Sequence, residues 1–265
     1  MDVIAFSESR IINELSEKLD AVARSRVSCV SSNDLSNCPV NEDATRPPRD
    51  CWDWFQAGST LDGIYTIHPE DFEPFDVYCD MTEGGGGWTM FQRRLNGLID
   101  FNRTWSEYRD GFGDLHDKHW LGNKYIHAMT RRFRQELRVD VGDWEDDQRY
   151  ERYSEFYVTS EEDMFRLYLR GTTGSAGDAL NYANGDKFST FDMENDADRN
   201  EHCAQKYGSG FWFYGCYDRY FANLNGQYYP SESVEQDKIR SNLGALAWVF
   251  VQSFTEMKLR PKPIQ

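Results

Sequence analysis

The stretch from Asp192 to Cys216 reads DMENDADRNEHCAQKYGSGFWFYGC, with alternating carboxylates before a cysteine, an aromatic run and a second cysteine. Its four alternating carboxylates are Asp192, Glu194, Asp196 and Asp198. Such groups repel one another on one face of an extended chain unless a cation lies between them. This density of oxygen ligands favours calcium. The alternative is a solvated acidic turn, which is what most runs of charge are.

The spacing is similar to the start of a helix-loop-helix calcium loop, which needs glycine at its sixth position and a bidentate glutamate at its twelfth. Counted from Asp192, these positions hold Ala197 and Cys203. The sequence therefore predicts a different kind of calcium loop, in which backbone carbonyls or water molecules complete the ligand set.

Length and composition limit the classes of protein that fit. A chain of 265 residues forms one large domain or one domain with an appendage, and 15% aromatic residues supply ample core. The net charge of -16 argues against nucleic acid and anionic membranes as partners, because binding to either depends on Lys and Arg. No stretch is long and apolar enough to span a membrane.

The cysteines indicate an oxidising compartment. Six of them fall into three groups along the sequence: Cys29 and Cys38, Cys51 and Cys79, Cys203 and Cys216. None forms the C-x2-C pattern of a zinc site, and an even number in an acidic, aromatic-rich protein fits disulfides. A glycosylation sequon at Asn102 agrees with secretion. The start, MDVIAFSESR, lacks the features of a signal peptide, so either the true N-terminus is missing or export is unconventional.

Residues 8–26 carry apolar side chains at three- and four-residue spacing, which predicts a short helix within a segment 1–30. Two heptads are marginal alone, so the helix is either the end of a coiled coil or lies on its own domain. Cys29 and Cys38 then link chains in a homo-oligomer or pair with each other. Residues 31–45 are polar and are predicted to be a linker.

After Cys51 the pattern changes to short alternating runs separated by Pro and Gly. The runs at 63–67, 75–79 and 88–92 predict a small antiparallel sheet. Four glycines, 84–87, precede the last of these runs, but no Gly-Lys-Ser/Thr follows them. A tight turn is therefore expected there rather than a phosphate-binding loop.

Several motifs in fixed order carry a resemblance to a known family. They are the run 48–94, DFNRTWSEYRDGFGDL (100–115), WLGNKYIHAMT (120–130), FSTFDMEND (188–196), CAQKYGSGFWFYGC (203–216) and NLNGQYY (223–229). Together they resemble the fibrinogen C-terminal globular domain, which fibrinogen chains, ficolins, tachylectins, tenascins and angiopoietins share. The resemblance covers residues 46–262.

The resemblance implies an α+β fold with three parts. These are a small N-terminal subdomain closed by a disulfide between Cys51 and Cys79, a central antiparallel sheet with short helices, and a loop-rich, calcium-binding C-terminal subdomain. A second disulfide falls on Cys203 and Cys216.

The calcium ligands implied by the resemblance are the carboxylates of Glu194 and Asp196 and the backbone carbonyls of Asp198 and Asn200. The family usually has Asp at the position of Glu194. The longer side chain moves the carboxylate oxygens, which changes the affinity or the geometry of the site.

In family members that bind acetylated sugars, an aromatic pocket lies beside the second disulfide. Its wall corresponds to Tyr207, Phe211, Phe213 and Tyr217, and the expected donor is the backbone N–H of Cys216, freed by a cis peptide after Gly215. The far wall is altered, because SESVEQDKIRSNLGALAW (231–248) retains only Trp248 of the family's aromatic residues there.

The histidines and the remaining acidic residues give no catalytic pattern. His116 and His119 are expected on the surface, His127 in a structural role, and the acidic turn at 143–147 in solvent. No Ser-His-Asp, Cys-His or paired-carboxylate arrangement is traceable.

Three functions remain. The leading one is a secreted calcium-binding lectin, of the kind used in innate immunity, which binds acetylated or related glycans multivalently. The alternative is an extracellular matrix or receptor-ligand module in which calcium is only structural. An enzyme, the third, has no support beyond the abundant carboxylates.

Overall fold

The computed structural model describes residues 46–95, 97–132, 134–145, 147–216, 222–229, 246–248 and 250–262. The predicted N-terminal helix, the linker, Cys29, Cys38 and Tyr217 lie outside these ranges. Within them, no helix has the length and hydropathy needed to cross a membrane.

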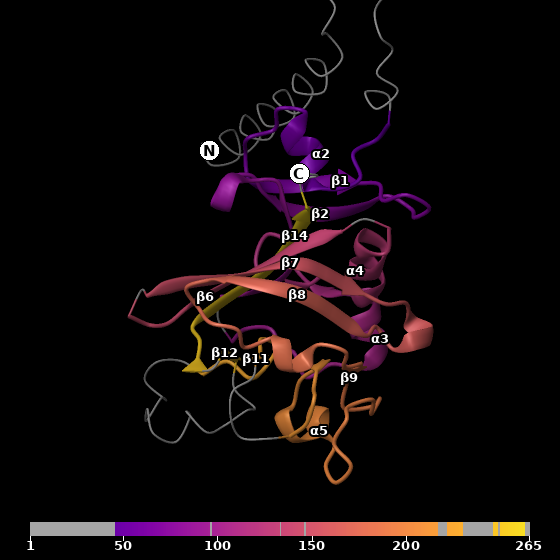
Figure 1. The fold of residues 1–265 in the computed structure, drawn as a ribbon, viewed down its shortest axis with the longest axis vertical. Coiled ribbons are helices and arrows are strands. Elements are labelled where there is room, and N and C mark those ends of the chain that lie inside the picture. Colours follow the sequence, from indigo (N-terminus) through magenta and orange to yellow (C-terminus); the bar gives the residue numbers. More distant parts are fainter. Residues whose placement is uncertain are drawn as a thin grey trace, which may run out of the picture.

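A large antiparallel sheet organises the described part of the protein (Figure 1). Its main path runs β1 (Gly63–Ile67), β2 (Phe75–Asp80), β3 (Trp88–Arg94), β14 (Phe254–Pro261), β6 (Gln135–Gly142), β7 (Gln148–Val158) and β8 (Leu167–Gly174). The short strands β4 (Phe112–Gly113) and β5 (His119–Trp120) pair with each other, and β5 also pairs with β3. The C-terminal strand β14 therefore lies between β3 and β6 in the middle of the sheet.

Three parts follow one another along the long axis of Figure 1. At one end lie α2 (Cys51–Gln56), β1 and β2, and in the middle lie the rest of the sheet, α3 (Trp105–Asp110) and α4 (Asn123–Thr130). The other end is rich in loops and contains α5 (Cys203–Tyr207), β9 (Phe188–Ser189) with β10 (Phe211–Trp212), and the small sheet β11 (Ala222–Asn223), β12 (Ala247–Trp248) and β13 (Phe250–Val251). Short 3-10 turns η3 (Glu83–Gly85), η4 (Glu161–Asp163) and η5 (Asn181–Ala183) complete the elements. The expected α+β fold is confirmed.

The N-terminal subdomain follows the sequence pattern closely. The predicted runs at 63–67, 75–79 and 88–92 are strands β1, β2 and β3, and the last two extend one and two residues further. A disulfide joins Cys51 at the start of α2 to Cys79 in β2, as expected. The glycine run forms a tight turn: at Gly86 φ is +73°, and a Cβ there would lie 2.2 Å from the carbonyl oxygen of Met81.

The core connects the central and C-terminal parts through aromatic rings. Trp120 lies at its centre, with ring centroids 5.5 Å from Tyr108, 5.7 Å from Phe188 and 5.9 Å from Trp212. All four side chains are buried. Because each large aromatic residue removes much apolar area from water, this cluster fixes β9 and β10, and with them the loop between these strands, against the central sheet.

Candidate functional site

The acidic loop lies between the paired strands β9 and β10, which hold its two ends together. Asp192, its first carboxylate, anchors the loop to the central part of the fold: Oδ1 accepts hydrogen bonds from the backbone N–H of Trp105 at 2.8 Å and from the hydroxyl of Thr190 at 2.7 Å. Trp105 is the first residue of α3. The carboxylate thus satisfies an N–H at the start of α3, where helix donors lack partners within the helix.

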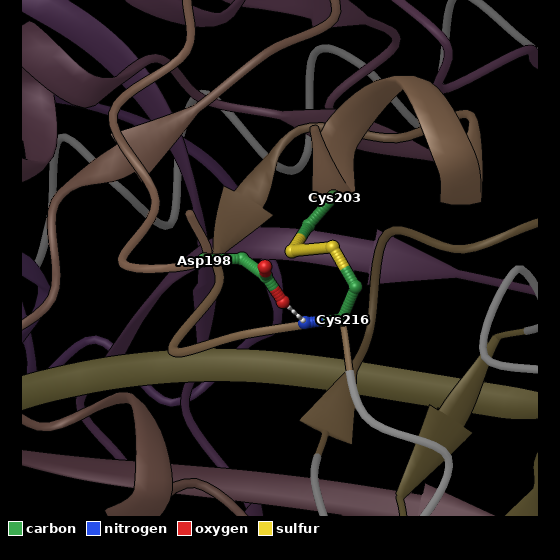
Figure 2. Close-up of side chains that lie close together, drawn as sticks. All are labelled: Asp198, Cys203 and Cys216. Atoms are coloured by element: carbon green, nitrogen blue, oxygen red, sulfur yellow. Dashed lines mark hydrogen bonds between the residues drawn. A yellow bond between two sulfur atoms is a disulfide. The ribbon is translucent and has the colours of Figure 1, made fainter. Parts of the chain in front are cut away.

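Asp196 and Asp198 each hold the backbone of one half-cystine. Asp196 is fully buried, with 0% of its side chain exposed, and its Oδ2 accepts from Cys203 N–H at 3.0 Å. Oδ2 of Asp198 accepts from Cys216 N–H at 3.0 Å. Figure 2 shows this carboxylate pointing at the Cys216 nitrogen beside the Cys203–Cys216 disulfide. Loop and disulfide therefore form one hydrogen-bonded unit.

The two carboxylates differ in electrostatics. Burial raises the pKa of Asp196, and the nearby charge of Glu194 adds to this effect. Hydrogen bonds from the backbone N–H groups of Asn200 and Cys216 lower the pKa of Asp198. A buried carboxylate next to another negative charge favours either a proton or a bound cation, so the side of the loop around Asp196 is the part that a cation would stabilise.

Asp186 belongs to the same acidic region, although the sequence did not predict it. Burial raises its pKa to about 6, and the charge of Asp196 also acts on it. Within the described residues its Oδ2 atom is buried without a hydrogen-bond partner. Asp186 lies outside the alternating run, so no local pattern in the sequence marks it as part of this region.

The expected calcium ligands all lie on this one loop. In the described part of the protein, the carboxylate of Glu194 and the backbone carbonyls of Asp198 and Asn200 accept no hydrogen bond, so their oxygens are available to a cation. The buried Asp196 carboxylate and these oxygens suit a hard cation such as calcium. By contrast, the group of Asp198, Cys203 and Cys216 is no metal site, because the two sulfurs form a disulfide and offer no thiolate.

The expected pocket wall is a packed aromatic cluster. Ring centroids of Tyr207 and Phe213 are 5.7 Å apart, those of Phe211 and Phe213 are 6.2 Å apart, and all three side chains are buried. Tyr214 next to them is 58% exposed. Among the described residues, it is thus Tyr214 rather than the expected wall that presents aromatic surface to solvent beside the disulfide.

The expected cis peptide before Cys216 is wrong: the described residues contain no cis peptide bond. A trans bond avoids the cost of about 3 to 4 kcal/mol for a cis bond without proline. The N–H of Cys216 is also taken by Asp198, so it is not free for an acetyl group. Trp248, the retained aromatic residue of the far wall, is buried and donates its indole N–H to the Gly177 carbonyl at 3.0 Å.

The histidines divide as follows. His116 is exposed as expected, and His127 is structural, with Nδ1 2.9 Å from the Val158 carbonyl. The expectation of a surface position for His119 is wrong, because β5 pairs with β3 and carries this residue into the interior. Burial lowers its pKa to about 4.

Asn102, the predicted glycosylation residue, is exposed and accessible to modification.

Known proteins are similar to this chain in sequence and in fold. A family model described as the C-terminal globular domain of fibrinogen beta and gamma chains matches residues 47–262. Fibrinogen C domain-containing protein 1 of Xenopus tropicalis is 40% identical over 221 residues, which are 81% of this chain and 48% of that protein. Human angiopoietin-2 is 41% identical over 202 residues, 76% of this chain and 40% of that protein. The chain spans about half the length, or less, of these relatives.

Two solved structures are similar as well. The fibrinogen-like globe domain of human ANGPTL6 matches with a TM-score of 0.73 at 30% identity, over 83% of this chain and 97% of that one. Lamprey fibrin D-dimer, complexed with the peptide ligand Gly-His-Arg-Pro-amide, matches with a TM-score of 0.72 at 29% identity, over 99% of this chain and 87% of that one.

Proposed function

The protein belongs to the family of C-terminal globular domains found in fibrinogen beta and gamma chains, and on this premise we propose that it is an extracellular binding module whose acidic loop holds calcium. Domains of this family are binding modules of an extracellular type rather than enzymes. The partner proposed for this domain is a protein, and calcium has a structural role.

Calcium would be held by the carboxylates of Glu194 and Asp196 and by the carbonyl oxygens of Asp198 and Asn200. When bound, the ion neutralises the carboxylates that burial and mutual repulsion destabilise. Asp196 and Asp198 hold the loop in place, because their carboxylates accept hydrogen bonds from the backbone N–H groups of the two half-cystines. A rigid loop loses less entropy when a partner binds, which favours recognition.

The observation that favours a protein partner is the hydrogen bond from Cys216 N–H to Asp198 at 3.0 Å. An acetyl group needs a donor for its carbonyl, and this donor is taken. The lamprey fibrin domain is described with a bound tetrapeptide, which supports peptide recognition as a use of the same fold.

The second candidate is the lectin that the resemblance implied. The aromatic cluster of Tyr207, Phe211 and Phe213 beside the disulfide favours it, and the exposed ring of Tyr214 adds apolar surface. A single acetyl site gains only a few kcal/mol, so such a lectin needs a homo-oligomer to bind with useful strength. The segment 1–30 with Cys29 and Cys38 is the proposed oligomerising part.

One experiment separates the two candidates. The full-length protein is passed over chitin beads and over chemically deacetylated chitin beads, each in millimolar calcium and in EDTA. The proposed function predicts no retention that depends on both acetyl groups and calcium. Retention that needs both, and that Tyr214→Ala at the 58% exposed ring abolishes while the melting temperature is preserved, establishes the lectin instead.

A further inference from the structure

The central sheet has a charged face opposite its apolar core. In β6, Leu137, Val139 and Val141 are buried in the core. Because side chains alternate along a strand, Arg138 and Asp140 point to the opposite face. Most sheets would expose such a face to water, yet Arg138 is buried too.

The strand register places three cations next to one another on this face. Lys258 in β14 is paired with Arg138 in β6, and Arg138 is paired with Arg152 in β7. Like charges in directly opposed positions destabilise a sheet unless carboxylates flank them. Here the Lys258 Nζ atom lies 2.6 Å from Asp80 and 2.9 Å from Asp140.

The network continues on both sides of this row. Glu256 lies 2.8 Å from Arg93 Nε and 3.4 Å from Lys258 Nζ. On the other side, Arg152 forms an ion pair with Glu136. Glu136 also accepts a hydrogen bond from Arg260 Nε at 2.6 Å. Ion pairs between cationic and anionic side chains therefore extend across four strands, β3, β14, β6 and β7.

Stability alone does not account for this arrangement. The Lys258 side chain is 1% exposed, and removing such a charge from water costs several kcal/mol before its partners offset the loss. Apolar replacements of buried ion pairs are often neutral or stabilising. A buried charge network that lines a groove is therefore a candidate for a binding role.

A groove of about 540 Å³ lies over these residues. Its lining includes the turn at Thr82–Gly84, the start of β7 at Gln148–Tyr150, and Phe254. This volume lies within the usual range of small-ligand sites, about 300 to 1,000 Å³. The groove is open to a ligand of a few sugar units or residues.

The charges of the groove point to a neutral ligand. Five basic and five acidic side chains line it, so their formal charges cancel, while the whole protein has a net charge of -16. An anion would meet the carboxylates, and a cation would meet the Lys and Arg row. An apolar ligand would remove these groups from water without replacing their hydration.

Spare hydrogen-bonding capacity refines the ligand class. The side chain of Arg152 is 34% exposed and lines the groove with N–H donors. Each carboxylate oxygen of Glu256 makes one ion pair, Oε1 with Arg93 and Oε2 with Lys258, and keeps a further lone pair. The lining thus offers both donors and acceptors, and adjacent hydroxyl groups can accept from one and donate to the other. Tyr150 at the rim is 38% exposed, with Arg138 4.3 Å from its ring centroid, and offers an aromatic face for a sugar ring.

We propose that this groove is a second binding site, for a neutral saccharide held through adjacent hydroxyl groups. It is formed by β2, β3, β14, β6 and β7, and Figure 1 places these strands apart from α5 and the acidic loop. The site does not depend on the partner or the calcium proposed for that loop.

The test is saturation-transfer NMR on the full-length protein in calcium with five probes. Three are neutral trisaccharides, namely maltotriose, cellotriose and mannotriose, and two are charged, a sulfated chondroitin disaccharide and trilysine. At least one neutral probe binds saturably with a Kd of about 1 mM, typical of a small exposed sugar site. Tyr150→Ala weakens that binding by about tenfold or more, as expected when an aromatic anchor is removed.

Matched controls make the result specific. Tyr182→Ala removes a 57% exposed tyrosine outside the groove and leaves the affinity unchanged. If Tyr150→Ala fails to fold, Gln148→Trp, which places a bulky ring at the exposed mouth, abolishes binding instead. The proposal is wrong if no neutral probe binds, if neither groove variant weakens binding, or if only a charged probe competes for the groove.

Discussion

The surroundings of a single carboxylate decide whether its pKa is raised or lowered. Asp196 and Asp198 are two positions apart, yet burial raises one pKa and backbone donors lower the other. The alternation of charged residues in the sequence predicts the acidic loop but not this difference. Neither the buried Oδ2 atom of Asp186 nor the trans peptide before Cys216 follows from local sequence, because both depend on which distant segments surround them.

His119 gives a prediction for pH. Its pKa of about 4 lies below the usual 6.5 because burial disfavours the charged ring. Between these values the unfolded state binds more protons than the folded one, so this residue makes stability fall as the pH falls from 6.5 towards 4. At pH 5 the loss reaches about 2 kcal/mol.

Urea unfolding of the parent and of His119→Leu at pH 7.5 and pH 5 checks this. The variant, which has no titrating group there, loses about 2 kcal/mol less than the parent between the two pH values. His116→Leu, at an exposed histidine three residues earlier, keeps the parent's pH dependence. Equal losses in the parent and His119→Leu contradict the assignment.

Among the helices and strands, local sequence pattern predicts where individual strands lie, but it does not predict which distant strands pair. Strands β1, β2 and β3 follow from apolar alternation between turns, since each strand is specified by its own residues. The insertion of β14 between β3 and β6 joins segments more than a hundred residues apart, and no local signal encodes it. The same holds for β5, whose pairing buries His119.

The acidic loop gives a calcium prediction. If calcium binds only the folded state, a hundredfold excess over Kd stabilises it by about 2.7 kcal/mol. Differential scanning fluorimetry in millimolar calcium and in EDTA therefore finds a higher melting temperature in calcium. Asp196→Asn and Glu194→Gln remove the shift, whereas Glu145→Gln, in an exposed acidic turn, retains it. Identical melting temperatures of the parent in both conditions exclude the site.

The two disulfides give a second prediction at this scale. Closing loops of 13 and 28 residues contributes about 3 kcal/mol each by the chain-entropy estimate. Replacing either pair by serine therefore lowers the free energy of unfolding by a similar amount. Only the change at Cys203 and Cys216 also reduces the stabilisation by calcium, because their backbone N–H groups bond the loop carboxylates.

Denaturation of both double variants with and without calcium measures this difference. The pair Cys51→Ser and Cys79→Ser serves as the control, since that disulfide lies in the opposite subdomain (Figure 1). Equal calcium stabilisation in the two double variants argues against coupling between loop and disulfide.

For the whole molecule, the family sets the architecture, and the segment before residue 46 is expected to set the assembly. Residues 8–26 are predicted to be the end of a coiled coil, and Cys29 and Cys38 follow them. The full-length protein is therefore expected to run as covalent oligomers on a non-reducing gel. Cys29→Ser with Cys38→Ser converts these to monomer bands, while light scattering still finds oligomers held by the helix. A parent that runs only as a monomer on the non-reducing gel contradicts interchain pairing.

The central position of β14 has a consequence for synthesis of the protein. During translation, β3 and β6 leave the ribosome long before residues 254–261, which must lie between them. Until then the nascent polypeptide holds two incomplete sheets with open edges, which is the state most exposed to misassembly. A polypeptide arrested before residue 254 is accordingly expected to remain sensitive to protease, and emergence of residues 254–261 is the event that lets the sheet close.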